Sequence, residues 1–351
     1  MPSKPPPFDV VEASALVRQL MNKSAEERAR WGNQGPPVNE LAFGQRIVAS
    51  YNELLTIESD ATYHEFLEQY VQRVFDNQWW KQEAAKGDAE RHIVVTWHLA
   101  TQEYFAQNRK GTGQLVQAPM PGETAHLLRL AFNLHQIKHL GLLQTSLLKR
   151  LKTKDQFQGG LYEVEVCASF VRGGFSIAHE PEGKGPHRLC EFVATHTATG
   201  KSYSIEAKSR HIPGVLGHPA DAKTSRRDEP NVSGLIRNAL GKEAAHDRII
   251  CVDVNFPQLD GTDASSTWGR VIREQVNVLE TAGLGPAMLI CTNSPFHYLQ
   301  RGQAARGQAF MMMGLGEPRF QPQDKDAVEQ DFPGTIAALA GFSKHVPGTW
   351  E

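Results

Sequence analysis

Residues 188–209 read RLCEFVATHTATGKSYSIEAKS, with two β-rich runs on either side of a short loop that ends in glycine. Two such runs around a loop of this length predict a β-hairpin, with one strand over 188–196 and the other over 201–209. If the loop residues 197–200 are unpaired, counting outward from them fixes which residues of the two strands face each other.

This register sets Glu191 opposite Glu206, with Lys208 on the same face of the second strand. Like charges directly opposite each other destabilise a sheet, and a divalent cation between them removes the conflict. The alternative is a charged, solvated face on which Lys208 screens the acids. That alternative leaves unexplained why the apolar Leu189 and Val193 flank Glu191 on the same side of its strand.

A helix is predicted before the hairpin, over residues 160–174, which read GLYEVEVCASFVRGG and end in a glycine pair. At helical spacing Glu163 shares its face with Phe170 and other apolar residues, whereas Glu165 shares its face with Arg172. We therefore expect Glu165 to be solvated and Glu163 to face inward. The alternative for Glu163 is an acid favoured by the helix dipole near the N-terminus.

Short runs in the helix and the hairpin, taken in order, resemble the core of the PD-(D/E)XK nuclease superfamily, the fold of restriction endonucleases and Holliday-junction resolvases. The resemblance covers about residues 157–295, less than half of the chain. In this family the first strand acid is usually Asp after Pro, whereas here Glu191 follows Cys190. The runs are YEVEV at 162–166, GFSI at 174–177, CEFV at 190–193 and SIEAK at 204–208.

The resemblance implies a metal-dependent phosphodiesterase, a nuclease, and in particular a DNA endonuclease. It assigns Mg²⁺, with Mn²⁺ as a substitute, to Glu191, Glu206, Glu163 and the backbone carbonyl of Ala207, in keeping with the preference of hard cations for oxygen ligands. Lys208 would assist the attack of water, so the expected catalytic set is Glu163, Glu191, Glu206 and Lys208. The alternative is a catalytically inactive protein that keeps the nuclease fold for binding or as a scaffold.

The stretches after the hairpin continue an alternation of strands and helices. Residues 248–255 and 287–293 are apolar runs typical of buried strands, and 267–280 is an amphipathic helix. For residues 151–351 we expect a restriction-endonuclease-like α/β/α sandwich with a mixed central sheet. Asp253 stands inside one of the apolar runs, and we interpret it as a strand-end or packing acid.

Residues 1–150 are expected to form an all-α N-terminal domain, because helical periodicity dominates there. Its role is open between substrate recognition and oligomerisation, so a homo-oligomer is among the expectations.

Charge in this chain is local. The net charge of the 351 residues is −2, but residues 201–250 carry nine Lys and Arg against six Asp and Glu, and 149–154 read KRLKTK. Basic runs beside a candidate nuclease site favour nucleic acid as the partner, DNA ahead of RNA.

A long loop, residues 211–230, follows the second hairpin strand and carries Lys223, Arg226 and Arg227. Loops longer than about 12–15 residues in compact domains are usually functional or disordered. We expect this loop to close on the phosphate backbone of a substrate through those three cations. A plain surface insertion is the equal alternative.

The cysteines indicate a reducing compartment. All four lie in apolar stretches without the C-x-x-C spacing of zinc or redox sites, so we expect small buried hydrophobic residues. No signal peptide and no run of membrane-spanning length is seen, so the expectation is a cytoplasmic protein without a membrane partner. The cysteines are Cys167, Cys190, Cys251 and Cys291.

Overall fold

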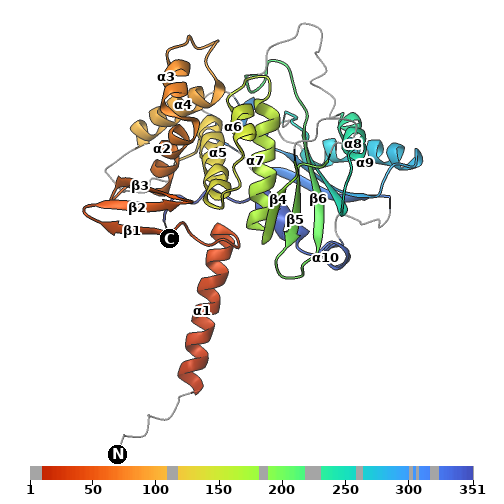
Figure 1. The fold of residues 1–351 in the computed structure, drawn as a ribbon, viewed down its shortest axis with the longest axis horizontal. Coiled ribbons are helices and arrows are strands. Elements are labelled where there is room, and N and C mark those ends of the chain that lie inside the picture. Colours follow the sequence, from red (N-terminus) through yellow and green to blue (C-terminus); the bar gives the residue numbers. More distant parts are fainter. Residues whose placement is uncertain are drawn as a thin grey trace, which may run out of the picture.

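The computed structural model describes residues 10–108, 118–181, 189–217, 231–257, 264–299, 303–305, 308–316 and 324–350, arranged as a mixed α/β protein (Figure 1). Its N-terminal part carries α1 (Val10–Trp31), β1 (Asn39–Ala42), β2 (Gln45–Ser50), β3 (Glu53–Glu58), α2 (Tyr63–Phe75), α3 (Asn77–Ala84), α4 (Ile93–Asn108), α5 (Gly122–His139) and α6 (Thr145–Leu151).

The N-terminal part is not all-helical, so that expectation is wrong. Strands β1, β2 and β3 form an antiparallel three-stranded sheet. The first connection is a two-residue turn in which Phe43 (φ 53°) and Gly44 (φ 73°) both have positive φ, as tight hairpin turns require. Val48, Leu55 and Ile57 turn one face of this sheet into the core. Their alternation with polar residues is the period-2 signal of strands.

The C-terminal part carries the larger sheet. Its elements are α7 (Phe157–Arg172), β4 (Phe175–His179), β5 (Phe192–His196), β6 (Ser202–Ser209), α8 (Ser233–Leu240), β7 (Asp247–Asp253), α9 (Ala264–Thr281), β8 (Ala287–Asn293), a 3₁₀ turn η1 (Pro295–Tyr298), β9 (Ala309–Leu315), α10 (Lys325–Asp331) and α11 (Thr335–Phe342).

The six strands form one mixed sheet, as predicted, and their order in it is β4-β5-β6-β7-β8-β9. β4, β5 and β6 are antiparallel, β6, β7 and β8 run parallel, and β9 is antiparallel to β8. The β5–β6 hairpin has the predicted register, because Phe192 faces Ile205 and Thr195 faces Ser202. The first strand is shorter than expected and begins at Phe192, one residue after Glu191.

Helices cover both faces of this sheet. On one face Ile249 and Cys251 of β7 share a hydrophobic cluster with residues of α7 and α11. On the other face Ile250 and Val252 of the same strand share a second cluster with residues of α8 and α9. Alternate residues of β7 thus point into different cores, which gives three layers, α/β/α.

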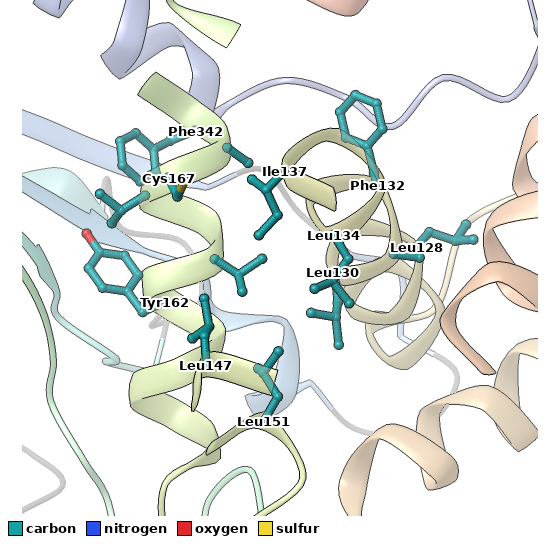
Figure 2. Packing of buried hydrophobic residues seen from close by; sticks show 14 of the residues in the cluster. Leu128, Leu130, Phe132, Leu134, Ile137, Leu147, Leu151, Tyr162, Cys167 and Phe342 are labelled. Carbon is teal, nitrogen blue, oxygen red and sulfur yellow. The ribbon is translucent and has the colours of Figure 1, made fainter. Parts of the chain in front are cut away.

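The first of these cores continues into the N-terminal part. Figure 2 shows the side chains that fill the space between α5 and α7, among them Leu130, Leu134 and Ile137. Near the end of the chain, Trp350 packs its ring against that of Tyr63, with the centroids 5.1 Å apart. The hydrophobic cluster therefore spans residue 150, and the division into domains 1–150 and 151–351 stays a prediction.

All four cysteines are buried, as predicted. No helix in the described parts of the chain is long and apolar enough to cross a membrane.

Candidate functional site

Three of the four predicted catalytic residues line one cleft of about 1100 Å³. Glu163 reaches it from α7, Glu191 from the residue before β5, and Lys208 from β6. Ala207, whose carbonyl was expected to bind metal, also lines it. β5 pairs with β6 from Phe192 opposite Ile205, and Glu191, one residue earlier, donates its backbone N–H to the Ile205 carbonyl at 2.9 Å. Glu206 is fully buried and contacts Lys208, which lines the cleft.

Glu206 is the most deeply placed of these acids, with 0% of its surface exposed. The ammonium groups of Lys208 and Lys242 lie beside it, yet among the described residues neither carboxyl oxygen receives a well-aligned hydrogen bond. Burial raises the pKa of the Glu206 carboxyl, and the charge of Glu191 raises it further, against the opposing effect of the two lysines. A buried carboxylate is costly unless cations compensate its charge, and here Lys208 and Lys242 do so.

Lys242 connects the two hairpin acids and was missed in the sequence. Its Nζ lies 3.0 Å from Glu191 Oε1 and 2.8 Å from Glu206 Oε1. Burial alone would lower the pKa of this lysine, but the two carboxylates outweigh it and raise the pKa. The only sequence signal was Gly241, which ends α8 just before Lys242.

Glu163 faces inward, as predicted, and is 5% exposed. Its Oε2 accepts a hydrogen bond of 2.7 Å from Arg150, a member of the basic run at 149–154. Burial raises the pKa of Glu163 to about 7, with Glu191 adding to the shift and Arg150 opposing it. The basic run thus supplies the counter-ion of a cleft acid.

Glu165 is not solvated, and that expectation is wrong. It is 7% exposed, and its Oε1 pairs with Arg129 Nε at 2.8 Å and accepts a hydrogen bond of 2.7 Å from Gln308. Arg172 is also buried and donates to Asn133 of α5. The face that looked solvated is polar because it packs against the polar side of α5, so α7 is buried on all sides.

Asp253 behaves as the packing acid that was predicted. Its carboxylate accepts hydrogen bonds from the Ser209 hydroxyl at 2.9 Å and from the Asn255 backbone N–H at 3.1 Å. Burial raises its pKa to about 7. It borders a cavity of about 30 Å³ shared with Glu165 and Arg129, apart from the cleft of Glu191.

The three loop cations, Lys223, Arg226 and Arg227, lie outside the described residues.

The chemistry of the cleft fits a hard divalent cation held mainly by the hairpin pair. Glu191 and Glu206 share the ammonium of Lys242, so their carboxylates point at one position. Glu163 pairs with Arg150, and in the described parts of the chain no three His, Cys, Asp or Glu side chains form a group that could hold a metal ion. The pair with Ala207 alongside offers oxygen donors, which Mg²⁺ and Mn²⁺ accept together with water.

Positive side chains surround these acids along the cleft, which could therefore receive an extended anion. They come from α6, β6, α8 and the segments that follow them: Arg150, Lys208, Arg210, Arg237 and Lys242.

In comparisons with known proteins, no protein-family model and no curated protein matches the chain.

Proposed function

We propose that this protein is a metal-dependent nuclease with a restriction-endonuclease-like core, acting as an endonuclease on DNA. The observation that carries the proposal is the fully buried Glu206, which contacts Lys208 and shares the ammonium of Lys242 with Glu191 beside an open cleft. Two facing carboxylates and a lysine in this arrangement suit the hydrolysis of a phosphodiester.

Each residue has a distinct role in this proposal. Glu191, Glu206 and the carbonyl of Ala207 would hold Mg²⁺, which, when bound, supplies charge neutralisation and a more acidic water. Lys208 would orient that water and offset negative charge on the phosphate in the transition state. Glu163, whose pKa of about 7 lets it exchange a proton near neutrality, would hold a water at the edge of the site.

The surroundings of the cleft support a nucleic-acid substrate. Arg237 and Arg210 line it, beyond the cations that contact the acids. A phosphate backbone offers repeated negative charges at a spacing that several separate cations can contact at once. DNA stands ahead of RNA because of the resemblance to restriction endonucleases.

A second function is an inactive nuclease fold used for binding or as a scaffold. The observation that favours it is Lys242, since one ammonium already compensates both hairpin acids without a metal. A site that has lost its metal would be expected to acquire such a cation.

The test is cleavage of supercoiled and linear DNA, and of RNA, by the full chain with Mg²⁺ or with EDTA. We expect cleavage of DNA with Mg²⁺ only, and a loss of about 100-fold or more in Glu206→Gln and in Lys208→Met. The matched control is Glu274→Gln, because Glu274 is an exposed acid that pairs with Arg270 on α9 at 3.3 Å. If no substrate is cleaved, the inactive scaffold is favoured. Cleavage that does not need a metal would refute the role of Glu206 in holding Mg²⁺.

A further inference from the structure

Lys242 has a fixed backbone and a side chain that reaches into the cleft. Arg248 donates hydrogen bonds to the carbonyls of Leu240 at 3.2 Å and of Lys242 at 2.6 Å. The Cys190 thiol donates to the carbonyl of Glu243 at 3.4 Å. These contacts hold the segment after α8 against the hairpin. Any movement of the ammonium therefore belongs to the four-carbon side chain, whose flexibility is a property of lysine.

The three acids at the cleft are already matched by the cations that pair with them, without a metal. Written in their ionised forms, three carboxylates face three cations, each within ion-pair distance of at least one acid. A divalent cation at the hairpin pair would add two positive charges beside an ammonium that occupies the same position. Because like charges at such distances repel strongly in a buried site, the ammonium and the metal exclude each other. The six groups are Glu163, Glu191, Glu206, Arg150, Lys208 and Lys242.

We propose that Lys242 is an exchangeable counter-ion: it occupies the divalent-cation position between Glu191 and Glu206 in the metal-free protein, and turns to the substrate phosphate once a cation binds there. This rests on the proposed function, because it takes the hairpin pair as the metal site. The exchange leaves the cleft with surplus positive charge, so binding of metal and of an anionic substrate should favour each other.

The first test is Ca²⁺ binding to the full chain without DNA, measured by calorimetry. Lys242→Met removes the competing ammonium, so Ca²⁺ should bind about tenfold tighter or more. The control is Lys201→Met, one residue before β6, where the Lys201 side chain is 42% exposed and pairs with Asp247 at 2.6 Å. Its Ca²⁺ affinity should match that of the unchanged protein. An unchanged or weaker affinity in Lys242→Met, or no Ca²⁺ binding by either protein, overturns the proposal.

The second test needs no variant, so it holds even if Lys242→Met fails to fold. An amine-selective reagent labels the unchanged protein, and peptide mass spectrometry follows Lys242. Its labelling rate should rise several-fold with Ca²⁺, because the ammonium leaves the two carboxylates, while the rate at Lys201 stays constant. Equal rates at Lys242 with and without Ca²⁺ overturn the proposal.

These measurements separate the two proposals. Ca²⁺-dependent release of Lys242 in a protein that cleaves nothing would refute the nuclease function and leave the counter-ion role intact. Mg²⁺-dependent cleavage without that release would refute the counter-ion role alone.

Discussion

Three buried glutamates of this chain are each ion-paired with at least one cation, which explains how they can be buried. Glu163 meets Arg150, Glu165 meets Arg129, and Glu206 meets two lysines. All three acids are buried, and a buried carboxylate persists only with such a partner. Lys208 stands two residues from Glu206, so the sequence already suggests that pair. Arg129 and Lys242 come from other elements, so their pairing with the acids depends on the fold.

Glu165→Ala should destabilise the protein by about 2–4 kcal/mol, because it leaves the buried guanidinium of Arg129 without its carboxylate partner and, among the described residues, with only the Gln308 amide oxygen as acceptor. The Arg129 side chain is 13% exposed and that of Glu165 9%, so water compensates little of the loss. Urea unfolding followed by circular dichroism measures the change. Glu274→Ala, on the exposed face of α9, should stay within about 0.5 kcal/mol. Equal stability of the two variants would show that the pair with Arg129 does not form.

The stability of the protein should depend on pH through Asp253. Its pKa is about 7 in the folded chain, and an unfolded aspartate has a pKa of about 4. The folded state therefore binds this proton more tightly. Stability from this group is present at low pH and is lost as the pH rises through 7.

Asp253→Asn lacks that titration, so its unfolding free energy relative to the unchanged protein should increase from pH 4 to pH 8. Urea unfolding of the two proteins at several pH values gives this difference. Curves that run parallel over the whole range would contradict the raised pKa.

At the scale of elements, the hairpin was predictable and the environment of α7 was not. The register of β5 and β6 follows from local sequence, since a short loop and alternating side chains fix it. One face of α7 is polar because its residues contact polar residues of α5. Helical periodicity does not distinguish such a buried polar face from one exposed to water. The meander at β1–β3 was missed because its strands are short and lie among long helices, although its period-2 pattern was present.

The contact between α7 and α11 depends on a glycine. A Cβ on Gly341 would lie 2.8 Å from the backbone oxygen of Ser169, so Gly341→Ala should push the helices apart and cost about 1–3 kcal/mol. Gly234 of α8 has open space around its Cβ position, so Gly234→Ala should instead stabilise by about 0.5–1 kcal/mol. Thermal unfolding of both variants checks the opposite signs. A stabilised Gly341→Ala protein would mean that the helices are less close than described.

At the scale of the whole molecule, the core that the N-terminal part shares with α7 and the sheet supports the cleft. The cluster that packs α5 against α7 also holds the sheet face behind Glu206, so the helical N-terminal part buttresses the hairpin acids. The N-terminal part therefore has a structural role. The cleft itself combines residues of α6, α7, the hairpin and the segment after α8, which are far apart in the chain.

The central claim is that Glu191 and Glu206 share a divalent cation. A crystal structure of the full chain with Mn²⁺, with anomalous data to locate the metal, tests it directly. We expect one Mn²⁺ bound by an oxygen of each glutamate, with the Lys242 ammonium displaced toward the open cleft. A structure without metal between them, in which Lys242 still bridges Glu191 and Glu206, would contradict it.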